Sequence, residues 1–351
     1  MNDEMPVALT GIKPTGDPHL GNYVGAIRPA LSLAHAHRAV YFIADYHALN
    51  TINDPAVLRR YTRSVAATWI ACGLDPASTL IYRQSHVPET FELSTILSSI
   101  TPKGLMNRAH AYKAAVDRNA AESRDRDAGV NMGLYTYPIL MAADILVMNA
   151  DVVPVGKDQV QHVEIAADIA ERFNHVYGSR FRFNVPRVSH EADEPSVMPG
   201  IDGRKMSKSY GNTIPLFGTS SELRKFCMRI VTDSTPLEAP KRTDGAPVMD
   251  ILSKFATPSQ LQEVTDSLQR GGTGWGAAKQ LLFTLLNEQM SPMREEYLRL
   301  LDPGSELDDV LDDGARRARE RAAVVLDGVR REIGVGRVGG VSGVGAQTRR
   351  F

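Results

Sequence analysis

Short apolar runs alternate with segments of helical spacing through the first half of the chain. The first run, residues 7–10, stops at Gly11 and is followed by a glycine-rich turn and a helical pattern that reaches about Ala36. Runs typical of buried strands recur along this half, at residues 7–10, 39–45, 79–82 and 152–156. Repeated strand–helix–strand units predict an α/β fold built on a parallel sheet with right-handed crossovers.

The second half of the chain changes to helical periodicity, with almost no strand signal. From about residue 220 to 332, apolar positions recur at helical spacing, and the turns between them carry Gly and Pro. We therefore expect a first domain at residues 1–217 and a helical domain at residues 218–333. The last stretch, 334–351, contains six glycines and no acidic residue, a composition that favours a flexible Gly-rich tail.

Composition narrows the class of protein. The 351 residues are 43% hydrophobic and 23% charged, which excludes a disordered, fibrous or disulfide-rich chain. The formal net charge is −1, so any contact with nucleic acid has to use local patches. Cys72 and Cys227 stand far apart without a CxxC or Cys/His neighbour, which favours a reducing compartment, the cytoplasm, and argues against a zinc site. The sequence shows no signal peptide and no apolar run of about 18 residues that could span a membrane.

The turn after the first predicted strand carries the first candidate site. Such a turn lies at the carboxyl edge of an open parallel sheet, where ligands bind. Gly11 and Gly16 permit tight backbone turns, and Gly21 leaves room for a flat ligand against bare backbone. The N-terminus of the following helix offers N–H groups to a phosphate, and His19 can donate to a phosphoryl oxygen. The alternative is a glycine-rich turn that binds nothing.

A second candidate site is the loop at residues 203–211, which contains Lys205-Met206-Ser207-Lys208. Two lysines bracket a small polar residue between glycines. Flexible ammonium groups on a mobile loop suit a polyphosphate that must be bound and then released. The alternative is an exposed charged loop without a ligand.

The third candidate is a helix at residues 133–148, opened by Pro138. Tyr137, Met141 and Asp144 follow an i, i+4, i+7 spacing and share one face. Asp144 stands in an otherwise apolar stretch, and burying a carboxylate costs several kcal/mol unless a partner donates to it. It is either paired with an internal arginine or backbone N–H, or it is an acceptor at the floor of an apolar pocket.

Together these motifs resemble class I aminoacyl-tRNA synthetases. His19-Leu20-Gly21 matches the first signature of that family and Lys205–Ser209 the second, while Asn22 replaces the second signature histidine, as in the tryptophanyl and tyrosyl subgroup. The helix at 133–148 and the segment at 151–159 are similar to those of bacterial-type tryptophanyl-tRNA synthetases. The resemblance covers nearly the whole chain and implies a Rossmann-like catalytic domain followed by an anticodon-binding helical domain.

The resemblance implies a two-step reaction. L-tryptophan is activated with ATP, accompanied by Mg²⁺, to tryptophanyl adenylate, and the tryptophanyl group is then transferred to tRNA(Trp). It also implies a homodimer, with no membrane partner and no metal ion held by protein side chains. Two regions rich in Lys and Arg, residues 103–126 and 314–337, are candidate RNA contacts, although solvated helix faces would have the same composition.

The resemblance also assigns site residues. Tyr137 and Gln159 would hold the substrate ammonium group, Asp144 would accept from the indole N–H, and Met141 would contact the ring. The expected amino-acid pocket consists of Leu9, Lys13, His47, Tyr137, Met141, Asp144 and Gln159. The expected nucleotide site consists of Lys13, Gly16, His19, Gly21, Asn22, Gly156, Asp158, Lys205, Met206, Ser207 and Lys208. The expected catalytic groups are His19, Lys205, Lys208 and Lys113.

Some of these residues have simpler interpretations. Asp158 is suited to cap a helix, His47 can have a structural role just past a strand end, and Lys113 can lie on a solvated helix face. Lys13 is a departure, because many bacterial tryptophanyl enzymes have glutamine there; it would place a cation beside the substrate carboxylate or the α-phosphate. Three alternative functions remain open: the tyrosyl enzyme of the same fold, a non-charging regulatory paralogue that binds tryptophan, and a small nucleotidylyltransferase.

Overall fold

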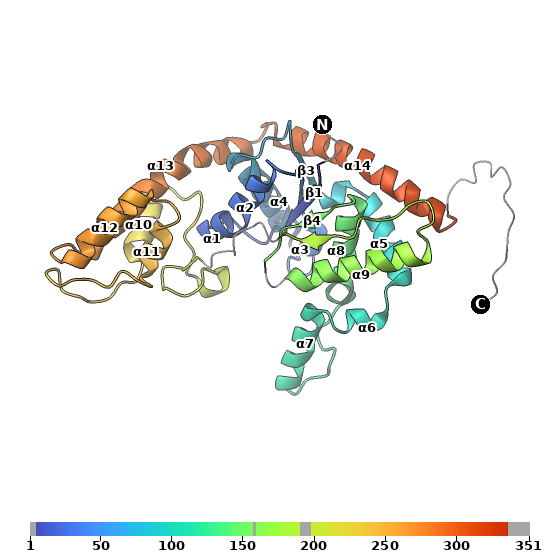
Figure 1. Ribbon diagram of the computed structural model, residues 1–351, viewed down its shortest axis with the longest axis horizontal. Coiled ribbons are helices and arrows are strands. Elements are labelled where there is room, and N and C mark those ends of the chain that lie inside the picture. The colour runs from blue at the N-terminus through green and yellow to red at the C-terminus, as the bar shows by residue number, and fades with distance from the viewer. Residues whose placement is uncertain (1–4, 157–158, 190–197, 336–351) are drawn as a thin grey trace.

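The computed structural model describes residues 5–156, 159–189 and 198–335, and the expected tail lies almost entirely outside them. A five-stranded parallel sheet in the order β3-β2-β1-β4-β5 forms its centre (Figure 1). The strands are β1 (Val7–Ile12), β2 (Arg38–Ile43), β3 (Leu80–Arg83), β4 (Val152–Val153) and β5 (Arg187–Val188). The predicted α/β class is confirmed, with a helical C-terminal part.

Helices connect the strands and make up most of the second half of the chain. Between the strands lie α1 (Leu20–Asn22), a π-helical segment η1 (Tyr23–Ile27), α2 (Arg28–Leu33), α3 (Asp45–Ala48), α4 (Pro55–Ala71), η2 (Gln84–His86), α5 (Glu89–Ile100), α6 (Lys103–Met106), α7 (His110–Ala121), α8 (Met132–Val147) and α9 (Val160–Val176). After β5 come η4 (Lys208–Tyr210), α10 (Ser220–Arg229), α11 (Pro247–Leu252), α12 (Pro258–Arg270), α13 (Trp275–Leu301) and α14 (Leu307–Glu332). In the part of the chain that the structure describes, no helix is long and apolar enough to cross a membrane.

The alternation of side chains along β2 explains how the sheet is covered. Tyr41 and Ile43 point to one face and belong to a hydrophobic cluster with α1, η1 and α4. Val40 and Phe42 point to the other face and belong to a second cluster with α5, α8 and α9. Because both faces are buried, the strands read as continuous apolar runs, which is why the sequence predicted them.

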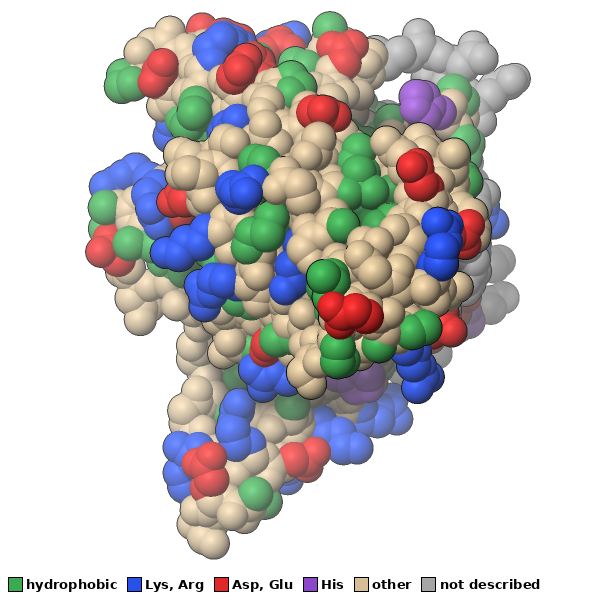
Figure 2. All heavy atoms as spheres, turned by 90° about the vertical axis from the view of Figure 1, so that its left-hand side faces the viewer, with side chains coloured by type: hydrophobic (Ala, Val, Ile, Leu, Met, Phe, Trp, Pro, Cys, Tyr) green, Lys and Arg blue, Asp and Glu red, His purple; other side chains and the backbone are tan. Residues whose placement is uncertain are grey.

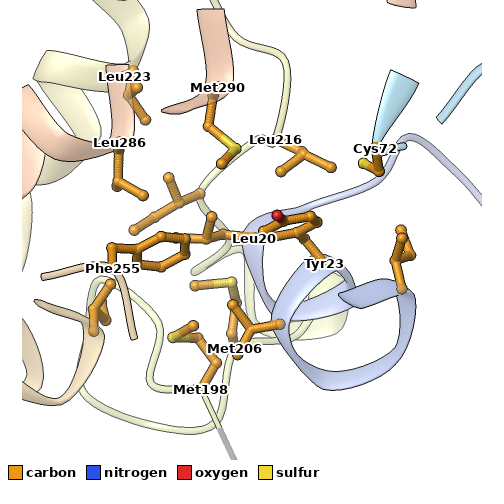
Figure 3. Packing of buried hydrophobic residues seen from close by; sticks show 14 of the residues in the cluster. Leu20, Tyr23, Cys72, Met198, Met206, Leu216, Leu223, Phe255, Leu286 and Met290 are labelled. Atoms are coloured by element: carbon orange, nitrogen blue, oxygen red, sulfur yellow. The ribbon is translucent and has the colours of Figure 1, made fainter. Parts of the chain in front are cut away.

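The first cluster continues from the sheet into the helical part of the chain. Leu20 and Tyr23, next to the glycine-rich turn, pack with Met206 of the two-lysine loop. Figure 3 shows these residues together with Phe255 and with Leu286 from α13. The turn, the loop and the helical part therefore share one hydrophobic core.

The last helix, α14, packs on the first half of the chain. Figure 1 shows α13 and α14 running along one side of the molecule, from the end that carries α10–α12 back past β3. Gly314 lies so close to β3 that a Cβ there would overlap the carbonyl oxygen of Ile81. Apolar residues of α14 belong to the second cluster with α5 and α8. We propose that the helical domain ends within α13, and that the predicted range of 218–333 combines it with a helix that belongs to the first domain.

Candidate active site

The glycine-rich turn runs from the carboxyl end of β1 to α1. His19 is the residue before the helix, with extended backbone angles (φ −123°, ψ 168°). Its backbone N–H donates to Oδ1 of Asn22 at 3.1 Å, which closes the first helical turn. Asn22 therefore acts here as a neutral hydrogen-bonding residue, consistent with the sequence interpretation.

The His19 imidazole is buried beside the helix start. Its Nδ1 has no hydrogen-bond partner among the described residues. Burial, and secondly the Lys208 ammonium, lower the pKa of His19 to about 4, so the ring is neutral at ordinary pH. A Cβ on Gly21 would lie 3.1 Å from Nδ1, which explains why the position following Leu20 is a glycine. A buried imidazole with an unsatisfied nitrogen is suited to meet a ligand atom.

Lys208 reaches from its loop to the glycine-rich turn. Its Nζ lies 2.7 Å from the position that a Cβ of Gly16 would occupy, and Gly16 has a φ of +131°. A cavity of about 250 Å³ opens between them, and its lining includes Lys13, Asn22 and Trp69. Burial lowers the pKa of both Lys13 and Lys208, because removal from water disfavours a charged ammonium group.

Hydrogen bonds hold the two-lysine loop, and the segment that directly follows it, against the glycine-rich turn. The Gly21 N–H donates to Sδ of Met206 at 3.2 Å. The backbone N–H of Leu20 donates to Ile214, and that of Leu216 donates to Pro18, at 2.9 and 3.2 Å. The glycine-rich turn and Lys208 of the loop thus line one cavity, although they lie far apart in the sequence. Ser207 N–H donates to the Asn212 side chain at 2.8 Å, whereas Lys205 is exposed and does not line the cavity.

Asp144 is 1% exposed, and it is held by two side chains. His47 Nε2 lies 2.9 Å from its Oδ2, and Gln84 Nε2 donates to both carboxylate oxygens at 2.8 and 2.9 Å. Burial raises the pKa of Asp144, and the bonds with His47 and Gln84 partly oppose this effect. The partners are thus neither the arginine nor the backbone N–H considered from the sequence. A carboxylate has about four lone-pair positions, so one remains for a further donor.

Gln84 was not predicted. It follows β3 directly, as His47 follows the end of β2, so both lie at the carboxyl edge of the sheet. The Tyr46 N–H donates to Oε1 of Gln84 at 3.1 Å, which turns the amide nitrogen toward Asp144. Its position just after a predicted strand, at the carboxyl edge of the sheet, is the signal in the sequence that could have identified this residue.

The remaining predicted pocket residues surround this edge. Tyr137 and Gln159 are half-buried, and both contact the ring of His162, with Tyr137 Oη at 2.7 Å and Gln159 Oε1 at 3.1 Å from its Nδ1. Leu9 is buried in β1, and Met141 packs against the second cluster. Gly156 accepts a backbone bond from Gln159 at 2.9 Å.

Two further expected residues are Asp158 and Lys113. Asp158 lies outside the described residues. Lys113 is exposed on α7, which projects from the body of the molecule (Figure 1), and it does not line the cavity. Among the residues that the structure describes, no three His, Cys, Asp or Glu side chains come together to hold a metal ion.

The chain combines a parallel sheet, a glycine-rich turn after its first strand and a two-lysine loop. Class I aminoacyl-tRNA synthetases have the same combination, and they use it to activate a carboxylate with a nucleotide. The family model described as tRNA synthetases class I (W and Y) matches residues 1–290, and the chain belongs to this family.

Individual relatives and solved structures show which members of the family the chain is similar to. The chain is 50% identical over 320 residues to the tryptophan–tRNA ligase of Xanthomonas axonopodis, covering 91% of this chain and 73% of the relative. It is 49% identical to that of Neisseria meningitidis, covering 93% and 97%. A crystal structure of the Campylobacter jejuni tryptophanyl-tRNA synthetase, complexed with ADP and tryptophan, superposes with a TM-score of 0.84 at 40% identity, covering 94% and 100%.

Proposed function

We propose that this chain is a tryptophan–tRNA ligase, which activates L-tryptophan with ATP and transfers it to the 3′ end of tRNA(Trp). The observation that carries the proposal is that a cationic cavity between Gly16 and Lys208 and a buried carboxylate, Asp144, lie at one edge of the same sheet. The first suits a triphosphate, and the second suits the donor-only indole N–H of tryptophan.

In the first step, the tryptophan carboxylate attacks the α-phosphorus of ATP and pyrophosphate leaves. The step depends on positioning and charge stabilisation more than on proton transfer. Neutral His19 stabilises the α-phosphate, and Lys13 lies where it reaches the same phosphate or the carboxylate. Mg²⁺ arrives with the nucleotide, held by phosphate oxygens and water.

The leaving pyrophosphate is assigned to the lysines of the loop. Lys208 already lies at the cavity, while Lys205 is exposed and needs a movement of the loop to reach it. Lys113 requires α7 to move toward the cavity. Gly156 and Asp158 are assigned to the ribose.

The tryptophan side chain is assigned to the pocket around Asp144. Its indole N–H donates to the remaining lone pair of that carboxylate, and Met141 contacts the ring. The substrate ammonium is assigned to Tyr137 and Gln159. His47 and Gln84 then keep Asp144 oriented rather than touching the substrate themselves.

Contacts with tRNA are assigned to the helical domain and to the arm formed by α6 and α7. Figure 2 views the molecule from the end that carries α10–α12; Lys and Arg side chains gather on one flank, and the projecting lobe below carries both signs of charge. The arginines of α14 fit this role less well, because they bond within the chain; Arg319 pairs with Glu89 and Arg330 with Glu92. Because charged tRNA is consumed in protein synthesis, we assign the protein to the cytoplasm.

A second copy of the chain is the further expected partner. Tyr46, Leu49 and Met132 are large apolar side chains that are exposed on α3, directly after it and at the start of α8. These segments are adjacent, because Asn50 packs against Gly133. We assign the homodimer contact to this surface, the apolar α3–α8 patch.

Tryptophan-dependent exchange of pyrophosphate into ATP tests the proposed function. We expect exchange with tryptophan and not with tyrosine. Asp144→Ala should raise the KM for tryptophan by about 10-fold to 100-fold, the loss expected when a hydrogen bond to a charged group is removed. The KM for ATP should change little. Asp168→Ala, at an exposed carboxylate on α9, is the matched control.

Other outcomes would point to the alternative functions. Exchange that prefers tyrosine would make the chain a tyrosyl enzyme. Tight binding of tryptophan without exchange or charging would make it a regulatory protein. An unchanged preference for tryptophan in Asp144→Ala would remove Asp144 from recognition.

A further inference from the structure

The cavity at the glycine-rich turn continues inward from a cationic mouth. The more accessible residues Lys13, Thr15 and Lys208 line the mouth. The buried residues Ile27 and Trp69 line the inner end, which lies between η1 and α4 on the face of the sheet opposite α8. Among the described residues that line this cavity none is acidic, so the whole space favours an anion.

The Trp69 indole is a buried donor on the inner wall. Trp69 is 1% exposed, and its Nε1 has no hydrogen-bond partner in the part of the chain that the structure describes. The adjacent Thr68 also lines the cavity, but its hydroxyl donates to the carbonyl oxygen of Ser64 at 2.6 Å. An indole N–H can only donate, so a ligand that meets it must bring an acceptor. Because a buried N–H without a partner is unfavourable, such an acceptor is bound more tightly there.

Asn22, at the end of α1, can supply a second neutral donor. Its Oδ1 accepts from the His19 N–H at 3.1 Å, so the NH₂ end of the amide is the end that can donate to a ligand in the cavity. Two ammonium groups, an amide and an indole therefore line one space of about 250 Å³. An ionised polyphosphate has acceptor oxygens along its whole length, and it matches a lining of this kind.

We propose that Trp69 is a binding residue for the pyrophosphate end of the nucleotide, with its indole N–H donating to the innermost phosphate oxygen. This inference deepens the proposed function and rests on it. Lys13 and Lys208 balance charge at the mouth of the cavity, and Trp69 adds a neutral donor at the inner end. The N–H is buried, so water does not weaken its bond to a charged oxygen.

Trp69 could instead serve only as a core residue. Its ring packs on Tyr41 with the ring centroids 4.7 Å apart, and the N–H would then meet a buried water. The two roles differ in the ligands they affect, because packing has no preference for distal phosphates. Inorganic pyrophosphate carries the proposed acceptor, whereas AMP has the base, the ribose and the α-phosphate without it.

Trp69→Phe tests the inference, since phenylalanine keeps an aromatic ring and removes the N–H. We expect the Kd of inorganic pyrophosphate, measured by calorimetry, to rise about 10-fold to 100-fold, as for a lost bond to a charged group. The Kd values of AMP and of tryptophan should each change less than about 3-fold. Trp275→Phe is the matched control, because the Trp275 N–H already donates to Asp233 at 2.8 Å in the helical part of the chain, and no Kd should change.

A second measurement leaves Trp69 in place. The sequence contains two tryptophans, so in Trp275→Phe the tryptophan emission comes from Trp69 alone. Adding inorganic pyrophosphate should shift this emission to longer wavelength, because the indole N–H gains a negatively charged partner, and adding AMP should not. The titration requires no substitution at Trp69, so it does not depend on whether Trp69→Phe folds.

Three results would overturn the inference. They are an unchanged affinity for pyrophosphate in folded Trp69→Phe, an equal loss of affinity for pyrophosphate and AMP, and an emission of Trp69 that does not respond to pyrophosphate. Failure of the proposed function would look different, since the parent protein would then bind pyrophosphate at Trp69 but would show no tryptophan-dependent exchange.

Discussion

Asp144 shows how one buried charge determines the side chains around it. Removing a carboxylate from water costs several kcal/mol, so its oxygens must be met by donors. The chain supplies His47 and Gln84 from two different strand ends. Because burial raises the pKa of Asp144, replacing either donor would favour the protonated acid further, and a protonated acid has less acceptor capacity for an indole.

His19 differs from Asp144, because burial keeps this side chain in its neutral form. Its pKa of about 4 keeps the ring neutral from pH 5 upward, so it can donate to a phosphoryl oxygen without a titration step. Lys208 contributes to that shift, and binding of an anion beside Lys208 would partly cancel it. The imidazole is thus neutral before the nucleotide binds, and its pKa rises as the phosphate arrives.

Gly16 gives a prediction at this scale. A side chain there would occupy the place of the Lys208 ammonium and would also be strained by the positive φ. Gly16→Ala should lower kcat for pyrophosphate exchange by about 10-fold or more, since charge stabilisation by one positioned cation is worth a few kcal/mol. The measurement is exchange kinetics with saturating ATP and tryptophan.

The matched control is Gly73→Ala. Gly73 also has a positive φ (+109°), but an added Cβ meets nothing within 4 Å. Gly73→Ala should lower the free energy of unfolding by about 1 kcal/mol through backbone strain and leave kcat unchanged. An equal kcat in the two variants would show that catalysis does not depend on the position of the Lys208 ammonium group against Gly16.

At the scale of elements, helices and strands with a clear hydrophobic pattern were predicted from the sequence, and very short strands were not. The three strands β1, β2 and β3 were predicted because each is an apolar run between turn signals. Of the run predicted at 152–156, only Val152–Val153 pairs as β4, because Pro154 cannot donate to a strand ladder. β5 has two residues, too few to show an alternation, and it was not predicted.

The candidate site divides in the same way. The glycine-rich turn and the two-lysine loop were predicted because each is a compact string of unusual residues. Gln84 and His162 were not assigned roles, because their partners lie on other elements; Gln84 and Asp144 are 60 residues apart. The position of α14 was not predicted either, since an amphipathic helix does not indicate which surface it will cover.

The contact between α14 and β3 gives a prediction about stability. Gly314→Ala should force the helix away from Ile81 and lower the free energy of unfolding by about 1–3 kcal/mol, the usual cost of overpacking. Gly276→Ala is the matched control, because Gly276 is also helical and an added Cβ meets nothing within 4 Å. It should be neutral or should stabilise by about 0.5–1 kcal/mol.

Thermal unfolding of both variants checks this prediction. If Gly314→Ala melts with or above the parent protein while Gly276→Ala behaves as expected, α14 does not pack on β3 in solution as it does in the structure.

At the scale of the whole molecule, one hydrophobic core joins the nucleotide site to the helical domain. Leu20 beside the glycine-rich turn, Met206 of the two-lysine loop and Leu286 of α13 belong to the same cluster (Figure 3). A movement of the helical part of the chain must therefore repack residues next to His19 and Lys208. This packing is a physical route by which the two sites can influence each other.

The proposed homodimer gives a prediction at the same scale. The double variant Leu49→Lys, Met132→Lys places two ammonium groups in the apolar α3–α8 patch, and we expect a shift from dimer to monomer in sedimentation velocity. Burying an unpaired charge costs several kcal/mol, and each 1.4 kcal/mol weakens association about tenfold. Val324→Lys is the control, because Val324 is 71% exposed on α14, similar to the 69% of Met132. A double variant that sediments as the parent protein would exclude this patch as the interface.

The late position of α14 in the chain has a consequence during synthesis. β3 is an edge of the sheet, and the helix that covers it begins more than two hundred residues later. A ribosome adding about 5–20 residues each second needs at least ten seconds to make that helix. For that time the nascent protein presents an open strand edge, which is a template for aggregation. A chaperone that holds the nascent chain would be most useful in this interval, before α14 emerges and packs against β3.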